Sequence, residues 1–261
     1  MVKKALFIIS LFIGSGIFAQ NSDFQHLLDR IEERKDAYVQ YDSFTSMAHS
    51  VSKKMTRKWT PKETTIVEKK IIQEKGKRLE EILKATEISK GKEKDVTEKL
   101  QKDEINRRKK QEERIEKEGE NSDEGGGSFS LGLDSINPFS KEKRDLFEFS
   151  ALSDSLIGER PVFCIHTTVK QPSDSLYQGR YFVDQETMDI LLMDIHPSKN
   201  PKAVKELHLK MWFDVLPGNY YVITDYWMKV YASIVIKGFR FLVEEQYSDY
   251  QIGISASSDS N

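Results

Sequence analysis

The stretch that decides the fold begins with Tyr177-Gln-Gly-Arg-Tyr-Phe-Val-Asp184 and ends near Tyr250. Within it follow Met188-Asp-Ile-Leu-Leu-Met-Asp-Ile195, Leu207-His-Leu-Lys-Met-Trp-Phe213, Asn219-Tyr-Tyr-Val-Ile-Thr224, Met228-Lys-Val-Tyr-Ala-Ser-Ile-Val-Ile236 and Phe239-Arg-Phe-Leu-Val243. Successive side chains of a strand point to opposite faces, so these six segments predict a sheet with one face buried or curved around something apolar. The pattern indicates binding on a surface and not reaction at a residue cluster.

The amino terminus has the layout of a secretory signal peptide. Met1-Val-Lys-Lys4 is basic, the run from Ala5 to Phe18 is apolar, and Ala19 is a small residue suited to cleavage before Gln20. The run is too short and too poorly flanked for a stable membrane anchor. We therefore expect residues 1–19 to be removed, and no stable transmembrane segment to follow.

Composition excludes several function classes. The only cysteine is Cys164, which rules out a disulfide within one chain and a multi-cysteine metal site. The formal net charge is −2, which gives no broad attraction to nucleic acid or to an anionic membrane.

The first part of the exported chain predicts one helix and three strands. Phe24, Leu27, Leu28, Ile31 and Tyr38 share one face of a helix over about residues 22–39. Strands are expected over 42–58 and 64–73, and over 77–88 after a turn at Gly76. The propensities of residues 78–85 also suit a helix, but the short connection around Gly76 favours a hairpin.

A highly charged segment interrupts this pattern. Between Ser89 and Gly127, Lys, Arg, Glu and Asp alternate with little apolar surface, and Gly125-Gly-Gly127 ends the run. Such a segment has too little apolar surface to order itself. We expect an inserted surface loop, with a solvated helix near 93–118 supported by i,i+4 ion pairs, followed by a flexible linker. A coiled-coil strand lacks a sustained apolar stripe.

The β pattern returns after Asn137-Pro-Phe139. Further strands are expected over 145–152 and 160–169, with a short helical turn over 202–207 and hairpin turns at 216–219 and 237–238. The predicted fold class is α+β, an open antiparallel sheet with an amino-terminal amphipathic helix and a charged insertion.

Two groups of residues are candidates for catalytic or metal chemistry. Cys164 and His166 share one strand face, and a thiolate–imidazole pair is one interpretation. Side chains two apart on a strand lie about 7 Å apart, so a buried cysteine beside a half-exposed histidine is favoured. Asp184, Glu186 and Asp189 lie around one turn. Their carboxylates are interpreted either as ligands of a cation or as caps of the backbone amides of the turn, and capping is favoured. We predict no catalytic residues, no metal and no cofactor.

The remaining candidates are apolar. Methionines and aromatic residues suit both an ordinary core and adaptable binding of acyl chains. The residues predicted to line an apolar cavity are Phe147, Phe149, Met188, Ile190, Met211, Phe213 and Trp227.

Several segments together resemble a known family. They are Phe24-x-x-Leu27-Leu28-x-x-Ile31, a long strand after Tyr41-Asp-Ser-Phe44, Gly179-Arg-Tyr-Phe-Val-Asp184-x-Glu186-Thr187, and the closing Phe239-Arg-Phe-x-Val-Glu-Glu-x-Tyr247-Ser-Asp-Tyr250. Over about 22–88 and 139–252 the chain resembles the periplasmic outer-membrane lipoprotein-sorting carriers of Gram-negative bacteria and their sensor-type relatives. The resemblance implies an open β half-barrel whose concave side is plugged by helices. The charged insertion is foreign to the family, and no functional arginine is carried over.

These inferences define an expected organisation and function. Residues 1–19 are the signal peptide, 20–88 and 139–253 the half-barrel, 89–138 the insertion and linker, and 254–261 a tail. The expected function is non-enzymatic binding of lipid acyl chains or lipoproteins in the periplasm of a Gram-negative bacterium. The alternative is an envelope interaction module that contacts a protein, such as an outer-membrane protein, through the insertion. A hydrolase using Cys164 and His166 is a distant third possibility.

Overall fold

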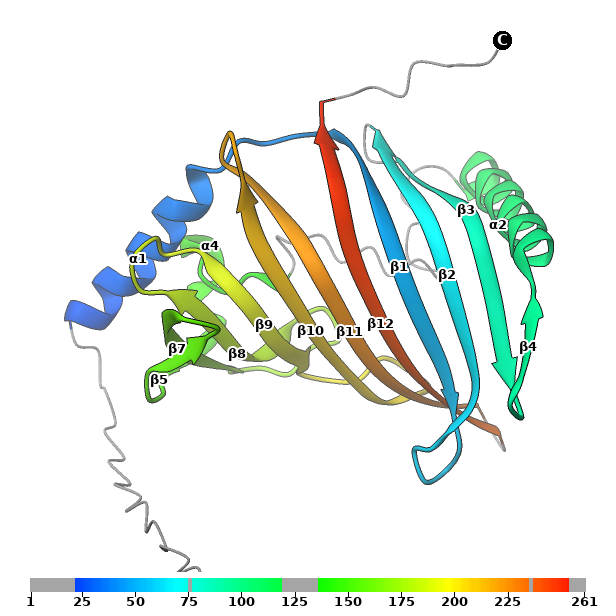
Figure 1. Cartoon of the computed structure of the whole chain (residues 1–261). Helices are drawn as coiled ribbons and strands as arrows, with labels where there is room; N and C mark the ends of the chain where they lie inside the picture. The colour runs from blue at the N-terminus through cyan, green and yellow to red at the C-terminus, as the bar shows by residue number, and fades with distance from the viewer. Residues whose placement is uncertain (1–21, 75–76, 119–135, 235–236, 254–261) are drawn as a thin grey trace, which may run out of the picture.

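The computed structural model describes residues 22–74, 77–118, 136–234 and 237–253. The expected signal peptide, the turn at Gly76, the linker over 119–135 and the tail from 254 lie outside these ranges. Over the described residues the chain forms one large antiparallel sheet with few helices (Figure 1).

Twelve strands and three helices of the described ranges make up this architecture. The helices are α1 (Ser22–Asp36), α2 (Thr97–Glu118) and α4 (Lys141–Arg144). The strands are β1 (Ser43–Met55), β2 (Pro61–Glu74), β3 (Lys77–Ser89), β4 (Lys92–Asp95), β5 (Phe147–Ala151), β6 (Ser155–Ile157), β7 (Arg160–Val169), β8 (Tyr177–Asp184), β9 (Ile190–Pro197), β10 (Val204–Leu216), β11 (Tyr220–Ile234) and β12 (Lys237–Ile252).

The last strand of the chain pairs with the first. The sheet order is β4-β3-β2-β1-β12-β11-β10-β9-β8-β7-β5, and β6 also pairs with β7. Phe44 of β1 lies opposite Ile252 of β12, and Lys54 lies opposite Phe241. Because β12 lies between β1 and β11, the amino-terminal strands and the carboxyl-terminal strands form one continuous sheet.

The apolar core lies on one face of the β7–β11 half of this sheet. Leu28 and Ile31 of α1 pack there, together with Phe139 and side chains from β7 to β11. Phe139 contacts Tyr181 edge-to-face with ring centroids 5.1 Å apart, and the Tyr181 hydroxyl donates to the carbonyl of Ile136 at 2.7 Å. The segment before α4 therefore belongs to the core and helps to hold α1 on the sheet.

Two expectations about secondary structure are corrected, and one is confirmed. The segments 219–224 and 228–236 are not separate strands, because β11 runs continuously from Tyr220 to Ile234. It continues through a β-bulge in which Thr224 is the extra residue between the pairs Phe213–Ile223 and Trp212–Asp225. The expected helical turn at 202–207 is wrong, because β10 begins at Val204. The hairpin interpretation of 77–88 is confirmed by β3, which pairs with β2.

The charged segment is more closely attached to the sheet than a solvated loop. β4 pairs with the last four residues of β3, and α2 lies beside β3 (Figure 1). The Thr97 hydroxyl accepts from the amide of Ala85 at 2.8 Å, and the Gln101 side chain donates to the carbonyl of Ile82 at 2.8 Å. Arg108 also donates to the carbonyl of Glu80. Side chains of α2 thus satisfy backbone groups of β3 that β4 leaves unpaired.

Candidate binding cavity under helix α1

A cavity of about 440 Å³ lies between the end of α1 and the core face of the sheet. Its apolar lining comes from α1, from the following segment and from β9, and its polar lining is mostly amide and phenol groups. The lining residues are Ile31, Lys35, Tyr38, Val39, Gln40, Tyr41, Gln73, Asn137, Met188, Ile190, Met193 and Tyr221. Ligand sites in proteins commonly occupy about 300–1,000 Å³ and combine apolar walls with a few polar groups.

Burial of one helical face fixes α1 over the sheet. Leu28 and Ile31 are 1% and 2% exposed, and they are one turn apart on the helix. Arg144 of α4 holds the opposite side of the helix by donating to the carbonyl of Leu28 at 2.7 Å and to Asp29 at 2.5 Å. Ile31 therefore reaches the cavity from a helix that is held both by packing and by charge-assisted hydrogen bonds.

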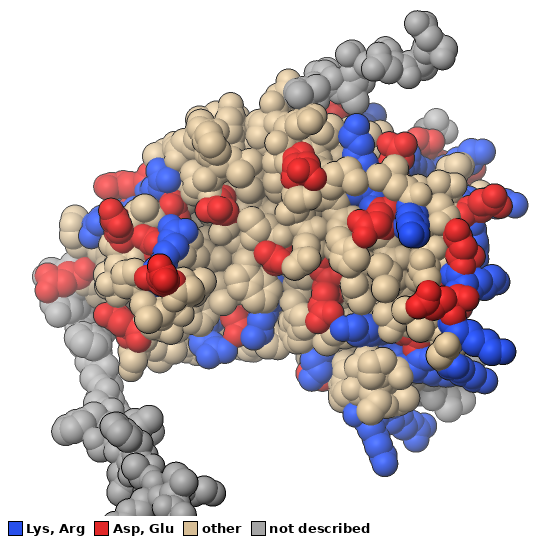
Figure 2. All heavy atoms as spheres, viewed as in Figure 1, with Lys and Arg blue, Asp and Glu red and all other residues tan. Residues whose placement is uncertain are grey.

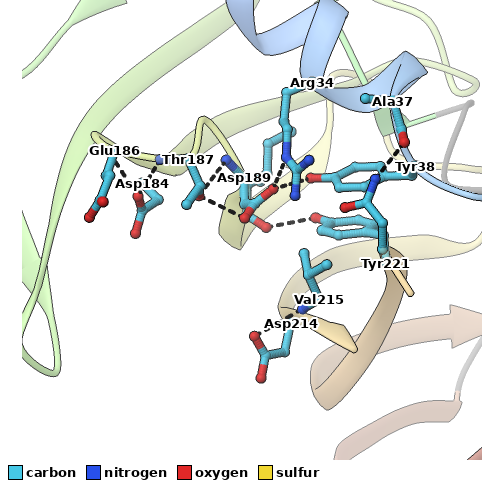
Figure 3. Close-up of polar contacts among 12 residues, drawn as sticks. Arg34, Ala37, Tyr38, Asp184, Glu186, Thr187, Asp189, Asp214, Val215 and Tyr221 are labelled. Atoms are coloured by element: carbon cyan, nitrogen blue, oxygen red, sulfur yellow. Dashed lines mark hydrogen bonds and ion pairs between the residues drawn. The ribbon is translucent and has the colours of Figure 1, made fainter. Parts of the chain in front are cut away.

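Asp189 makes a second connection between the sheet and the end of α1 (Figure 3). Its carboxylate accepts from Arg34 Nε at 2.6 Å, from the Tyr38 hydroxyl at 2.8 Å and from the Thr187 hydroxyl at 2.6 Å. Asp189 is only 3% exposed. Because a buried carboxylate needs such donors, this cluster fixes the position of Tyr38 at the cavity wall.

Stacked aromatic rings form the side of the cavity next to this cluster. Tyr38 stacks on Tyr221 at a centroid distance of 4.5 Å, and Tyr221 stacks on Phe213 at 4.9 Å. The Tyr221 hydroxyl donates to the carbonyl of Ile190 at 2.6 Å. Burial raises the pKa of both Tyr38 and Tyr221, and Asp189 adds to the effect at Tyr38. The wall is therefore neutral at physiological pH.

The turn between β8 and β9 uses its carboxylates for local structure. Asp184 accepts from the amides of Glu186 and Thr187 at 2.9 Å and 2.8 Å, and from Arg160 Nε at 2.7 Å. Asp189 is occupied by the donors described above. These contacts agree with the capping interpretation of Asp184.

The seven residues predicted to line a cavity fall into three places. Met188 and Ile190 line it. Phe147 is buried beside Phe149, while Met211 and Phe213 belong to the core cluster next to the cavity. Trp227 lies on the opposite face of the sheet, where its ring contacts His208 and Lys210.

The bulge explains the position of Trp227. Tyr221 and Ile223 face the core, and unbroken alternation would turn Trp227 to the same side. The extra residue Thr224 reverses the alternation, so that Tyr226 and Met228 face the core instead.

Sequence reasoning missed most of the polar lining. Tyr41 and Gln73 meet because β1 and β2 pair beside the end of α1, and Asn137 comes from a segment more than sixty residues further along the chain. The sequence predicts Tyr38 on one face of a helix over 22–39, but α1 ends at Asp36 and Tyr38 lies in the segment that follows it. No local pattern indicates that these groups converge.

The Cys164–His166 pair does not form a reactive thiolate in this structure. Cys164 is 6% exposed, and burial raises its pKa. The His166 ring contacts the Thr168 hydroxyl at 3.4 Å. A buried thiol with a raised pKa is a poor nucleophile, as the favoured interpretation of this pair implies.

Comparison with known proteins gives structural similarities only. No protein-family model matches the sequence, and no curated protein matches it. A putative outer membrane lipoprotein-sorting protein domain from Vibrio parahaemolyticus is similar at 9% identity and a TM-score of 0.39, over 88% of this chain and 94% of that one. A LolA superfamily protein from Nitrosomonas europaea gives 11% identity and a TM-score of 0.33, over 88% and 94%.

A complex structure of MucA and MucB from Pseudomonas aeruginosa is also similar, with 9% identity, a TM-score of 0.27 and coverage of 89% and 100%. Lipoprotein-sorting and LolA proteins, which the sequence resembles, are thus among the solved structures that are similar to this chain. At TM-scores below 0.5 these similarities do not decide function. Within the described ranges, no helix has the length and apolarity needed to cross a bilayer.

Proposed function

We propose that this chain is a non-enzymatic binding protein of the Gram-negative periplasm that holds an acyl chain of a lipid or lipoprotein in the cavity under α1. The carrying observation is the cavity itself, about 440 Å³ in volume and walled by Ile31, Met188, Ile190 and Met193. The expected signal peptide supports export.

The character of the walls favours an unbranched apolar chain. Methionine side chains adapt to ligands of different shape, and Met188 and Met193 are among the apolar residues on the sheet side. The tyrosine rings add rigid apolar surface. The charged cluster at Asp189 is already satisfied by protein donors, so it offers the ligand no unpaired charge.

Binding of a fluorescent fatty acid tests the proposal. Val39 is 43% exposed at the edge of the cavity, so Val39→Trp obstructs the entrance without altering the core. We expect at least tenfold weaker binding for Val39→Trp and for Ile190→Trp, which fills the interior. Leu83→Trp is the matched control, because Leu83 is 47% exposed on β3 and remote from the cavity lining.

Two results would contradict this function. One is unchanged probe affinity in both cavity variants, with circular dichroism spectra matching the parent. The other is the absence of any lipid or acylated protein in native mass spectra of protein purified from its host envelope.

A second candidate function is contact with an envelope protein through α2. Ile105 is 51% exposed on this highly charged helix, and a partner could cover it. Deleting the helix would uncover β3, so the better variant is Ile105→Glu. This change should abolish co-purification of a partner and leave fatty-acid binding unchanged; partner retention would remove the candidate.

A further inference from the structure

Basic side chains gather at one end of the sheet, away from the cavity. The register places the β1–β2 turn, the β3–β4 turn and the loop before β10 at the same end, because Lys54 lies opposite Phe241 and Val204 lies opposite Ala232. Exposed cations project from all three connections, and Figure 2 shows Lys and Arg crowded in the lower right, where the first two lie. They include Arg57, Lys58, Lys62, Lys90, Lys92 and Lys202.

The other end of the same strands carries exposed acids. Asp42, Asp214 and Asp249 are exposed there, before β1, near the end of β10 and near the end of β12. Lys77 and Arg78, at the start of β3, are exposed at this end as well, so its charges are mixed. An approaching anionic surface is therefore attracted more strongly to the basic end.

An aromatic residue in an unusual backbone conformation lies in the β1–β2 turn at the basic end. Trp59 has a φ of 59°, which is rare for a bulky side chain and costly unless other contacts maintain it. The turn is closed by the Thr56 amide donating to the carbonyl of Thr60 at 2.8 Å, and by their hydroxyl groups 2.6 Å apart. The conformation brings the indole within 4.4 Å of Lys229 Nζ.

A second cation lies close to the same ring. The guanidinium carbon of Arg240 is 5.9 Å from the Trp59 centroid and 3.9 Å from the Tyr231 centroid. Lys229 also pairs with Glu206 at 2.6 Å. Phe239, on the strand that carries Arg240, is 38% exposed. The end therefore combines cations, an indole and an exposed phenyl ring.

We propose that this basic end docks the protein on an anionic membrane surface. Lys and Arg are attracted to acidic headgroups, and Trp is favoured at the boundary between headgroups and hydrocarbon. Single-stranded nucleic acid fits less well, because such sites need open aromatic faces for base stacking, and Trp59 is engaged by Lys229. The proposal goes beyond the cavity and does not depend on what the cavity holds.

Vesicle flotation of the full chain tests the docking surface. Every variant is made in a Phe7→Asp, Phe12→Asp background, which interrupts the apolar run of the expected signal peptide. Arg57→Gln/Lys58→Gln/Lys62→Gln is compared with Lys99→Gln/Lys102→Gln/Lys109→Gln, which makes the same charge change on exposed residues of α2. Vesicles contain phosphatidylcholine alone or with phosphatidylglycerol.

We expect binding only to the anionic vesicles. Binding should be lost in 0.5 M salt, because the Debye length falls from about 10 Å at 0.1 M to roughly 4 Å. Each basic residue near the surface contributes about fivefold in affinity, so the turn variant, which loses three, should bind about a hundredfold more weakly and the α2 control less than threefold. Trp59→Ala should lower the affinity for anionic vesicles a further few-fold, and Trp59→Phe is the variant with which it is compared.

Three outcomes would overturn the proposal. They are equal losses in the two triple variants, equal binding to neutral and anionic vesicles, and retention on a soluble anionic polymer without vesicle binding. Fatty-acid affinity measured on the same turn variant keeps the two proposals separate, because it should stay unchanged whichever way flotation turns out.

Discussion

The two halves of this sheet bury different kinds of side chain on the same face. Over β7–β11 the face is apolar and is covered by α1 and the segment around Phe139. Over β3, β2, β1 and β12 it carries small and charged groups. Ser46 and Ala48 lie on β1 beside Lys69 of β2, and all three are buried.

In the second half, a network of ion pairs is buried beside apolar residues such as Ile71 and Ala48. Lys69 Nζ lies 2.9 Å from Glu245 and 3.0 Å from Glu80, and Arg78 pairs with Glu80 at 3.0 Å. Burial of Glu80 by itself would raise its pKa, but Lys69 and Arg78 together lower it. One backbone architecture is therefore stabilised by dispersion and apolar burial on one side, and by satisfied charges on the other.

Removing the Phe139 side chain should have the largest effect on stability, because this residue lies in the core of the apolar half. Phe139 is 0% exposed, and Phe139→Ala should reduce the free energy of unfolding by about 3–5 kcal/mol in urea titrations. Ile71→Ala is the matched change in the other half. Ile71 is also 0% exposed, but its cross-strand neighbours are Ser46 and Glu80, so we expect a smaller loss. Equal losses would mean that the halves are packed alike.

Breaking the charged network tests the other side of the comparison. Lys69→Met removes the cation nearest to buried Glu245 and leaves only Arg78 at 3.9 Å from it, so it should cost about 3 kcal/mol in the same titration. Adding Glu245→Leu removes this carboxylate and should recover much of the loss. A double variant that is no more stable than Lys69→Met would show that the charges do not act as a pair.

Asp189→Asn should loosen the cover of the apolar half. The substitution removes the charge that holds Arg34 and Tyr38, and should cost about 2 kcal/mol, with faster amide hydrogen exchange in α1. Glu186→Gln, an exposed change in the same turn, should leave both measurements unchanged. Unaltered exchange in Asp189→Asn would mean that packing of Leu28 and Ile31 is sufficient to hold the helix.

The smallest effect should be the contribution of Tyr41, at the cavity wall, to the loss of stability at alkaline pH. Burial raises the pKa of Tyr41 from 10.0 to about 12. The unfolded chain therefore ionises first, so the stabilising effect is complete below pH 10 and is lost as the pH rises from 10 toward 12. Stability measured from pH 9 to 11 should fall less steeply in Tyr41→Phe than in the parent; identical slopes would exclude this contribution.

The sequence predicts the strands better than it predicts the site. Alternation located the strands of the second half, and the short connection near Gly76 favoured the hairpin that β3 confirms. The bulge at Thr224 could not be foreseen, because one extra residue leaves the local composition unchanged while reversing every later side chain.

The cavity was inaccessible to sequence reasoning for a different reason. Met188 and Ile190 were identifiable as apolar strand residues, but Asn137 and Gln73 reach the cavity only through pairings between distant parts of the chain. The charged segment differs from its prediction in how closely it is attached to the sheet. Its composition indicates solvation, whereas Thr97 and Gln101 find partners in the backbone of β3.

This attachment of α2 has a consequence for self-association. A sheet grows by adding strands to its edges, and here one edge is occupied by a four-residue charged strand and by a helix bonded to β3. The edge formed by β5 and β6 is the other one, flanked by Leu152 at 45% and Leu156 at 66% exposure. If two copies paired through that edge, neither copy would have an open edge left. Sheet extension in this protein would therefore stop at a pair, and it would not continue into a fibre.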